Sequence, residues 1–277
     1  MTPSTPSRRV LVTPRSLTQQ GLASVAELSP LTAAGFELIG SEPGQSPSES
    51  DLRTLLDGVE GWIAGVEAIG ARVIGGADAL KVIARNGSGV DNIDVAAAER
   101  AGIRVTAAPG ANAQGVAELA VTLVLSCIRR VPWSAALVKE GGWHRPIARE
   151  LSELTIGVVG LGAIGRRVAA SCSALGAHVI AHDPYVGDCD VEQAELNELL
   201  AASDVVSLHL PPTADGRPLL GAVELSLLPD GAIVVNTARA SLVDDDAMLY
   251  ALDAGAVAAY AVDAFASEPP SLTRLLL

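Results

Sequence analysis

The segment TIGVVGLGAIG (155–165) restricts the fold of this chain more than any other. Its first half is a nearly continuous apolar run, as expected for a strand buried on both faces of a parallel sheet. Three glycines follow in the spacing G-x-G-x-x-G, and apolar residues then recur at helical spacing: Ile164, Val168, Cys172 and Leu175. The glycine pattern alone is a weak signal. A strand that turns through it directly into a helix is typical of doubly wound α/β sheets.

The same turn indicates a ligand. Gly160 permits a tight turn, Gly162 lets the backbone approach a pyrophosphate, and Gly165 lets the helix pack closely on the strand. A helix that begins here directs its free N–H groups and the positive end of its dipole towards a phosphate. We therefore expect a dinucleotide to bind at this turn.

Asp183 indicates which dinucleotide binds. It ends the next predicted strand, where a carboxylate accepts hydrogen bonds from the adenosine ribose and repels the additional phosphate of NADP. The sequence thus predicts NAD. Asp183-Pro184 is also an ordinary turn sequence, and Arg166 and His182 lie near enough in sequence to soften the preference.

Apolar strand-like runs alternate with helical stretches along the whole chain and predict an α/β protein with two doubly wound parallel-sheet domains. The first, a flavodoxin-like substrate domain, covers 1–108, and the second, a Rossmann NAD domain, covers 109–277. Strands are expected at 8–14, 36–40, 61–65, 81–86, 103–108, 155–160, 177–183, 204–210, 232–238 and 258–265. Helices are expected at 66–79, 92–101 and 109–132, from about 163, and at 191–201, 222–228 and 244–254.

The long helix at 109–132 connects the two predicted domains. Val116, Leu119, Leu123 and Cys127 form an apolar stripe along it, and Pro132 stops or kinks it. Such a stripe can also face a second subunit, so a homodimer through residues 111–131 is expected.

Composition excludes several classes of partner. The formal net charge is −13 without a cluster of Lys and Arg, so nucleic acid and anionic membrane surfaces are not expected partners. Cys127, Cys172 and Cys189 have no CxxC spacing, which indicates reduced cysteines in the cytoplasm. The N-terminus is expected to be a short polar leader and not a signal peptide, and no apolar run approaches the length of a membrane span.

A cluster of three acidic residues and a single arginine also need an interpretation. Asp244, Asp245 and Asp246 are better explained as the negatively charged start of a helix than as a metal site, and no metal is expected. Arg239 follows a predicted strand, at the sheet edge where doubly wound folds bind ligands, and a guanidinium there suits a substrate carboxylate. Its residue type alone is equally compatible with a surface ion pair.

Several segments together resemble one family, the NAD-dependent D-2-hydroxyacid dehydrogenases, in the branch similar to phosphoglycerate dehydrogenase. They occur in the family's order over about residues 60–270: ARNGSGVDNID (84–94), PGANAQGVAELA (109–120), GLGAIG (160–165), HDPY (182–185), HLPPT (209–213), NTARASLVDDDAM (236–248) and VDAFASEPP (262–270). The resemblance implies hydride transfer between NAD and a small 2-hydroxy or 2-oxo acid, in a cleft between the domains.

The resemblance also implies roles for single residues. Arg239 would hold the substrate carboxylate and carbonyl, Glu268 would orient a catalytic histidine, and the backbone N–H groups of Asn86 and Gly87 would help to hold the carboxylate. The cofactor would be contacted by these residues: Ser88, Gly160, Gly162, Ala163, Ile164, Gly165, Asp183, His209, Thr237, Ala238 and Asp263.

One expected residue is missing. In the resembling family the catalytic histidine lies beyond the paired prolines, after one more strand, whereas this sequence ends at Leu277. We therefore expect a C-terminally shortened dehydrogenase that lacks the last strand of its Rossmann domain, and that binds NAD(H) but turns over poorly or not at all. Two alternatives stay open: a non-catalytic NAD-binding sensor or scaffold, or an enzyme that uses another base. Of the remaining histidines, His209 is the closest candidate for such a base, and His144, His178 and His182 are expected to be structural.

Gly65 bears on the substrate. It stands where close phosphoglycerate dehydrogenases carry an arginine that reaches the substrate, so a phosphate or second carboxylate would lose a charge-assisted contact. 3-Phosphoglycerate is therefore a doubtful substrate, and another small 2-hydroxy acid is equally compatible with the sequence. Ala240 replaces a glycine that is usual in the family, which is a minor change.

Overall fold

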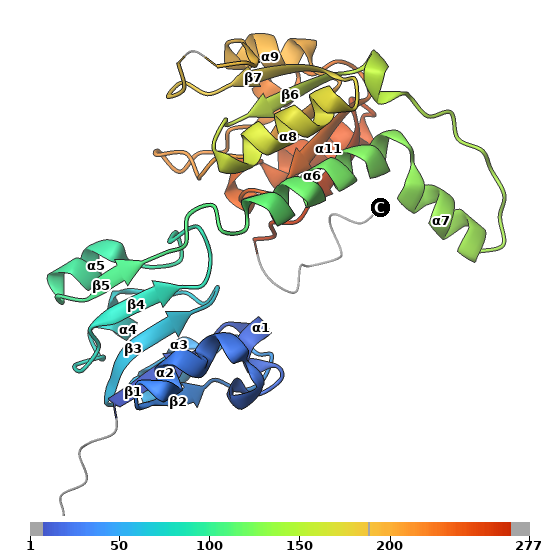
Figure 1. Ribbon diagram of the computed structural model, residues 1–277. Coiled ribbons are helices and arrows are strands. Elements are labelled where there is room, and N and C mark those ends of the chain that lie inside the picture. Colours follow the sequence, from blue (N-terminus) through green and yellow to red (C-terminus); the bar gives the residue numbers. More distant parts are fainter. Residues whose placement is uncertain (1–7, 188, 267–277) are drawn as a thin grey trace, which may run out of the picture. The chain divides into compact units, whose positions relative to one another are not determined.

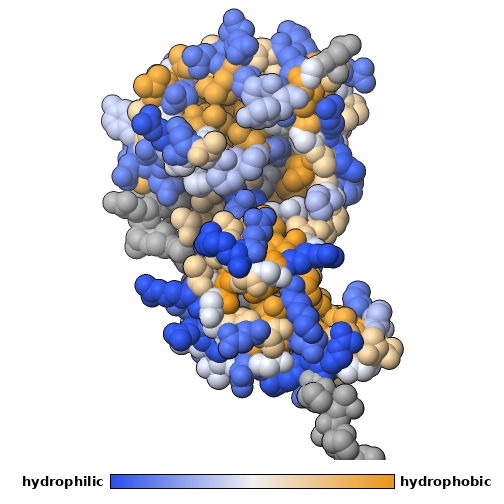
Figure 2. Space-filling view, turned by 90° about the vertical axis from the view of Figure 1, so that its left-hand side faces the viewer, coloured by the Kyte–Doolittle hydropathy of each residue, from blue (hydrophilic) through white to orange (hydrophobic). Residues whose placement is uncertain are grey.

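The computed structural model describes residues 8–187 and 189–266 (Figure 1). The chain divides into two compact units, which we call unit 1 (Met1–Asn112) and unit 2 (Ala113–Leu277). The predicted boundary at 108/109 lies a few residues before this division. On the face drawn in Figure 2, hydrophilic side chains are spread over each unit with apolar groups between them, as on an ordinary water-exposed surface.

Unit 1 is built on a five-stranded parallel sheet in the order β2-β1-β3-β4-β5. This is the flavodoxin-like strand order, and it confirms the predicted fold class. The strands are β1 (Arg8–Val12), β2 (Phe36–Gly40), β3 (Val59–Ala64), β4 (Val82–Arg85) and β5 (Arg104–Thr106). The helices are α1 (Arg15–Thr18), α2 (Ser29–Ala33), α3 (Glu49–Leu55), α4 (Ala71–Ile74) and α5 (Val95–Arg100), with short 3-10 turns at Leu22–Ser24 and Ala26–Leu28.

The core of unit 1 lies mainly on one face of this sheet. Leu11, Trp62 and Ile83 from three neighbouring strands are buried there against α3, α4 and α5. The helix predicted at 66–79 is wrong over most of its length, because only α4 is helical. Ile69 instead forms a bridge with Ile93, and this bridge ties the segment after β3 to the segment after β4.

Unit 2 is built on a six-stranded sheet in the order β11-β10-β9-β6-β7-β8, with all pairs parallel. Numbered along unit 2 this is the Rossmann order 3-2-1-4-5-6. The strands are β6 (Thr155–Val159), β7 (His178–His182), β8 (Glu192–Gln193), β9 (Val205–Leu208), β10 (Ala232–Asn236) and β11 (Val257–Val262). The helices are α6 (Ala113–Ile128), α7 (Val131–Lys139), α8 (Ala163–Ala174), α9 (Leu196–Ala202), α10 (Ala222–Leu225) and α11 (Asp245–Asp253), with 3-10 turns at Leu151–Glu153 and Ala240–Leu242.

Two expectations for unit 2 need comment. The helix predicted at 191–201 begins only at Leu196, because Glu192 and Gln193 form the short edge strand β8, whose exposed polar residues give no strand pattern. The expected lack of a last strand concerns residues beyond those that the structure describes.

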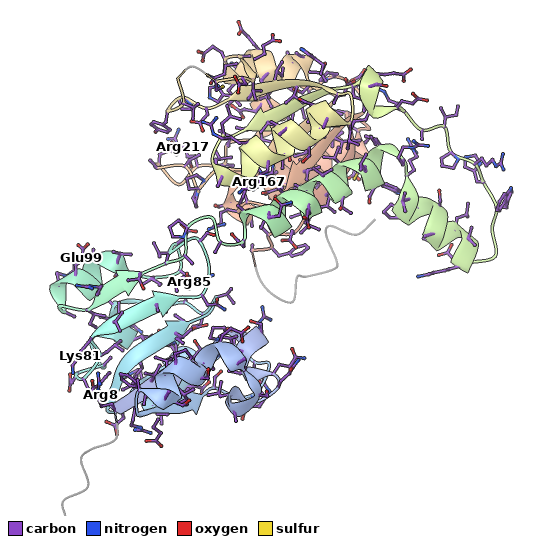
Figure 3. The ribbon with its side chains drawn as sticks, viewed as in Figure 1. Arg8, Lys81, Arg85, Glu99, Arg167 and Arg217 are labelled. Carbon is purple, nitrogen blue, oxygen red and sulfur yellow. The ribbon has the colours of Figure 1, made fainter. Side chains whose placement is uncertain are left out.

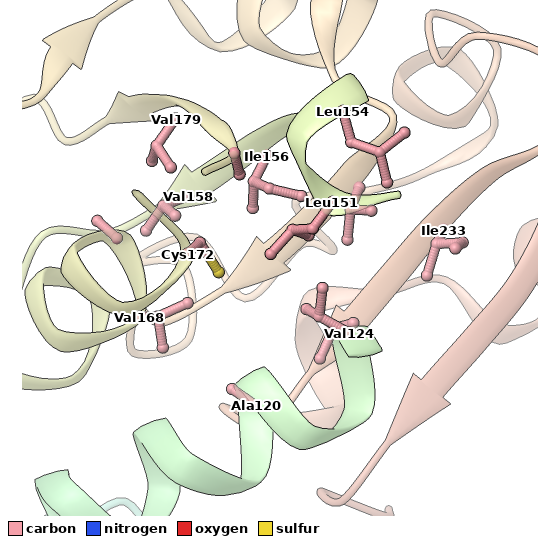
Figure 4. Close-up of a cluster of buried hydrophobic side chains, with 14 of the residues drawn as sticks. Ala120, Val124, Leu151, Leu154, Ile156, Val158, Val168, Cys172, Val179 and Ile233 are labelled. Atoms are coloured by element: carbon pink, nitrogen blue, oxygen red, sulfur yellow. The ribbon is translucent and has the colours of Figure 1, made fainter. Parts of the chain in front are cut away.

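Helix α6 buries a different stripe from the predicted one. Its core-facing residues are Ala113, Ala117, Ala120, Val124 and Ile128, whereas Val116, Leu119, Leu123 and Cys127 are only half-buried. Figure 4 shows Ala120 and Val124 turned towards the cluster that contains Val168, Cys172 and Ile233. Small alanines let α6 approach α8 and the sheet closely, while Leu123 and Cys127 pack only partly buried against the same core.

The chain bends sharply after α6. Arg130 adopts a left-handed backbone conformation with φ 52°, and Pro132 occupies the first turn of α7, so α6 and α7 meet at 64°. The predicted stop near Pro132 is thus observed, but α7 was not predicted. Among the described residues no single helix has both the length and the apolar character of a membrane span, although the bent pair α6–α7 taken together does.

Candidate cofactor site and its partner loop

The glycine turn of unit 2 is shaped by contacts that exclude side chains. Gly160 has φ 93°, and a Cβ on it would lie 2.4 Å from the carbonyl oxygen of His209. A Cβ on Gly165 would lie 1.9 Å from the carbonyl oxygen of Gly160. Around Gly162, in contrast, nothing lies within 4 Å of the Cβ position. The turn is therefore tight on its protein side and open at Gly162, where a ligand can approach the backbone.

Helix α8 begins in this open space. Its N-cap residue Gly162 has no side chain to satisfy the first turn, and within the described residues the N–H groups of Ala163 and Ile164 have no acceptor. Arg167, whose position on α8 is labelled in Figure 3, donates to the carbonyl oxygen of Ala163. Unsatisfied N–H groups at the start of a long helix bind phosphate well.

Asp183 lies beside the same turn, directly after β7. Its Oδ2 accepts a hydrogen bond from the N–H of Leu161 at 2.8 Å, and its Oδ1 accepts one from the N–H of Tyr185 at 3.0 Å. The carboxylate is half-buried and keeps lone pairs for further donors such as ribose hydroxyls. The glycine turn and the acidic group are therefore held together as one site.

Two buried polar atoms at this sheet edge lack a partner among the described residues. They are Nδ1 of His209, which follows β9, and Oγ1 of Thr237, which follows β10. The other ring nitrogen of His209, Nε2, lies 2.8 Å from Oγ of Ser207. Orphaned buried polar atoms are costly, so they point to a polar ligand that completes them. Together with the open backbone at Gly162 they fit a dinucleotide such as NAD.

Burial lowers the pKa of His209 to about 4, so its imidazole is neutral at physiological pH. In the unfolded chain the pKa returns to about 6.5. The neutral ring therefore stabilises the fold fully above pH 6.5, and this contribution is lost as the pH falls from about 6.5 to about 4. We expect the wild-type free energy of unfolding to decline over this range by up to about 3 kcal/mol more than that of His209→Gln.

Denaturant titrations at several pH values measure this difference. His178→Gln is the matched control for the loss of a histidine, because the His178 side chain is exposed beside Glu192. Equal pH slopes for wild type and His209→Gln would show that His209 titrates normally in the folded protein.

Arg239 lies two residues after Thr237. The side chain of Asn236 holds the backbone of this segment by two hydrogen bonds. The fully buried amide of Asn236 donates to the carbonyl oxygen of Arg239 at 2.9 Å and accepts from the N–H of Ala238 at 3.0 Å. Asp263 follows β11, and its N–H donates to the carbonyl oxygen of Asn236 at 3.0 Å. Asn236 was not predicted as a site residue. Its position in the sequence, three residues before Arg239, was the feature that could have indicated this role.

The predicted substrate loop lies in unit 1, directly after β4. The N–H groups of Asn86 and Gly87 already donate to Ala64 and Arg85, both at 2.9 Å, so they are not free to bind a carboxylate. Within the described part of the chain, the N–H groups of Ser88 and Gly89 have no acceptor. Figure 3 shows Arg85 at the end of β4, where it donates to the carbonyl oxygen of Asn86.

Ser88, which was predicted to contact the cofactor, lies in unit 1. Its hydroxyl lies 2.5 Å from the side-chain oxygen of Asn112 and 3.4 Å from the carbonyl oxygen of Ala108. The other predicted cofactor residues, and Arg239, lie together at the carboxyl ends of the strands of unit 2. Glu268 lies outside the described residues.

A cavity of about 140 Å³ lies elsewhere on unit 2. Its lining includes Leu154, Asp204, Val205, Ile233 and Ala258, which stand at the amino ends of β6, β9, β10 and β11. This is the sheet edge opposite the glycine turn. The cavity is therefore not part of the candidate cofactor site.

The fold and this edge define unit 2 as a dinucleotide-binding domain of the Rossmann class. Residues 121–277 match the family model described as "D-isomer specific 2-hydroxyacid dehydrogenase, NAD binding domain". The match covers more than half of the chain. The protein therefore belongs to the D-isomer specific 2-hydroxyacid dehydrogenase family, and unit 2 contains the family's NAD-binding domain.

Individual relatives agree with this assignment. The chain is 44% identical over 216 residues to the D-3-phosphoglycerate dehydrogenase of Archaeoglobus fulgidus, covering 76% of this chain and 41% of that protein. The crystal structure of the TT0316 protein from Thermus thermophilus is similar with a TM-score of 0.85 at 37% identity, over 95% of this chain and 83% of that one. A D-lactate dehydrogenase from Aquifex aeolicus, complexed with NAD and lactic acid, has a TM-score of 0.80 at 29% identity over 94% and 78% of the two chains. The chain thus spans about two fifths of the archaeal relative's length.

Proposed function

We propose that this protein is an NAD-dependent D-2-hydroxyacid dehydrogenase that interconverts a small 2-hydroxy acid and its 2-oxo acid. The observation that carries the proposal is the shared sheet edge of unit 2, where the glycine turn, Asp183, His209 and Arg239 all lie. The Aquifex relative with NAD and lactic acid has the same fold, which supports both the cofactor and the substrate class. When bound, NAD supplies the hydride acceptor.

Arg239 would bind the substrate. Its planar guanidinium can hold a carboxylate by two parallel hydrogen bonds and can stabilise charge on the adjoining carbonyl oxygen. Asn236 is fully buried and donates to the carbonyl oxygen of Arg239, so it fixes the backbone from which the Arg239 side chain projects. In unit 1 the N–H groups of Ser88 and Gly89, unlike those of Asn86 and Gly87, are open to a substrate carboxylate.

Asp183 would bind the adenosine ribose and exclude NADP. Ala163 and Ile164 would donate their N–H groups to the pyrophosphate, and Gly162 leaves the space for it. His209 Nδ1, Thr237, Ala238 and Asp263 would contact the nicotinamide half of the cofactor.

Among the described residues, no histidine is well suited to act as the base that accepts the proton of the substrate's hydroxyl group. His209 is neutral but a weak base, because burial lowers its pKa to about 4. His178 is exposed beside Glu192, and His182 contacts the carbonyl oxygen of Ala194 at 3.0 Å. His144 lies in an exposed segment. The competing function is an NAD-binding protein without turnover that acts as a redox sensor or scaffold.

An NADH-oxidation assay separates the two functions. Protein expressed from its complete reading frame is tested with glyoxylate, pyruvate, hydroxypyruvate and 4-methyl-2-oxopentanoate, and the loss of NADH absorbance is followed. The dehydrogenase proposal predicts turnover with at least one of them. NADH binding without turnover on any 2-oxo acid would support the sensor or scaffold instead.

A homodimer through α6 and α7 forms part of the proposal. The half-buried stripe of α6 continues into exposed apolar side chains on and after α7: Val131, Trp133, Val138, Trp143 and Ile147. Trp143 is 78% exposed and Ile147 is 94% exposed, which is unusual for such large apolar groups grouped in one segment. A second copy of this chain would cover them.

A cytoplasmic location is proposed from the three free cysteines.

We expect a dimer in sedimentation at micromolar concentration. Introducing a charge by Trp133→Glu should shift the protein to monomer, because burying an unpaired carboxylate in an interface is strongly unfavourable. Val223→Glu is the matched control, since Val223 is 69% exposed on α10, on a different part of unit 2. A wild-type protein that sediments as a monomer contradicts the proposal.

A further inference from the structure

The carboxyl edge of the sheet in unit 1 carries a buried acid, Glu67. It is only 5% exposed. Its Oε1 accepts a hydrogen bond from the N–H of Gly65 at 2.9 Å and a short one from the hydroxyl of Thr13. Thr13 follows β1 and also accepts a hydrogen bond from Nε1 of Trp62 at 2.9 Å. Acids are rarely buried without such partners, so this carboxylate is held in a defined place by the ends of β1 and β3.

Gly65 is the residue that makes room for this acid. A Cβ on Gly65 would lie 2.7 Å from Oε2 of Glu67 and 3.1 Å from Cα of Pro14. Glu67 therefore occupies the space that a side chain at position 65 would need. The sequence indicated that Gly65 replaces an arginine of close phosphoglycerate dehydrogenases. The structure shows in addition that the carboxyl group of Glu67 lies beside this position.

The acid is close to the loop that offers free donors to a substrate. The N–H of Asn86 donates to the carbonyl oxygen of Ala64 at 2.9 Å, so the segments after β3 and β4 leave the sheet side by side. The side-chain amide of Asn92 donates to the carbonyl oxygens of Gly65 at 3.2 Å and Glu67 at 2.7 Å. The segment that carries Glu67 and the loop with Ser88 and Gly89 are thus tied into one edge.

We infer that Glu67 is a specificity-determining residue, which disfavours 2-oxo acids with a second anionic group and favours those whose remainder is neutral or cationic. The inference rests on the proposed dehydrogenase function. A fixed carboxylate in a poorly solvated edge repels a second anion more strongly than one in water would. Such a repulsive element gives selectivity without adding a contact to the preferred substrate.

Glu67→Gln tests the inference, because glutamine keeps the shape and an acceptor oxygen for Gly65 but removes the charge. The kcat/KM values for NADH-dependent reduction are compared for 2-oxopentanoate and 2-oxopentanedioate, which differ by one carboxylate. We expect the variant to raise kcat/KM for the dianion at least about tenfold relative to the monoanion, whose own value stays within about threefold of wild type. Glu67→Asp, which keeps the charge, should retain the discrimination.

Glu99→Gln is the matched control, because Glu99 is an exposed acid on α5 of the same unit (Figure 3). It removes the same charge at the surface and should leave the ratio of the two kcat/KM values unchanged. If Glu67→Gln lowers both values equally, or leaves their ratio at the wild-type value, Glu67 only braces the loop and the inference is overturned.

A binding measurement keeps the inference testable if the protein does not turn over. In the presence of NADH, the affinities of oxamate and tartronate, a monoanion and a dianion, are measured by the fluorescence of the buried Trp62. Trp62 reports on this edge because it donates to Thr13, a partner of Glu67. A protein inactive on every 2-oxo acid refutes the proposed function. An unchanged affinity ratio in Glu67→Gln refutes the inference.

Discussion

Gly165→Ala is expected to weaken NADH binding at least about 100-fold and to lower the free energy of unfolding by about 2–3 kcal/mol. The methyl group would be placed 1.9 Å from the carbonyl oxygen of Gly160, which is backbone and cannot rotate away. Helix α8 would have to move away from β6, and the N–H groups of Ala163 and Ile164 would leave the phosphate position with it. Calorimetry with NADH and denaturant unfolding measure the two effects.

Gly115→Ala is the matched control for this change. Gly115 lies in α6, and nothing is within 4 Å of its Cβ position. Alanine has the higher helix propensity, so this variant should bind NADH normally and gain about 0.5–1 kcal/mol of stability. Normal NADH affinity in Gly165→Ala would mean that the cofactor does not depend on the glycine turn.

Arg239→Met is expected to reduce kcat/KM for the preferred 2-oxo acid by about 10²–10³-fold, because it removes the donors for the carboxylate and the developing oxyanion. Arg239→Lys should recover only part of this loss, since an ammonium group cannot replace the planar fork. The affinity for NADH should change little, because the side chain is proposed to contact the substrate. Steady-state kinetics and NADH titration of each variant separate the two effects.

Arg217→Met is the control for loss of a positive charge near this edge. Arg217 lies in the exposed loop after β9 and pairs only loosely with Asp215 at 3.9 Å (Figure 3). It should keep wild-type kcat/KM. If Arg239→Met also keeps it, Arg239 has no role in substrate binding, and the proposed chemistry would need another carboxylate-binding group.

Much of the fold could be predicted because buried parallel strands are nearly continuous apolar runs. The strand at 36–40 was placed correctly to the residue, and β6 and β10 to within two residues. The wrongly predicted elements are those whose burial is not reflected in the spacing of apolar residues along the sequence. β8 is too short and polar to alternate, and the segment 66–79 is apolar at helical spacing although most of it packs as irregular chain around Glu67 and Ile69.

The face of α6 could not be inferred from residue size. The larger residues Val116, Leu119 and Leu123 form the more evident stripe. The face that packs on α8 and the sheet instead begins with three alanines, which allow a close approach, and ends with Val124 and Ile128.

The glycine turn was predictable because its geometry follows from three residues, whereas the loop after β4 was not. Which of its N–H groups are free depends on the pairing of β3 with β4, which uses Asn86 for the sheet and leaves Ser88 and Gly89 open. Glu67 was missed for a similar reason. A lone acid after a strand has no signal of burial, and only the contacts with Gly65 and Thr13 reveal it.

Calorimetric titration of the wild-type protein with NADH and with NADPH examines the glycine turn and Asp183 together, and these two features define the cofactor site. We expect saturable binding of NADH and at least about tenfold weaker binding of NADPH, whose additional phosphate would meet the carboxylate of Asp183. Heat from neither nucleotide, or tighter binding of NADPH, would contradict this expectation.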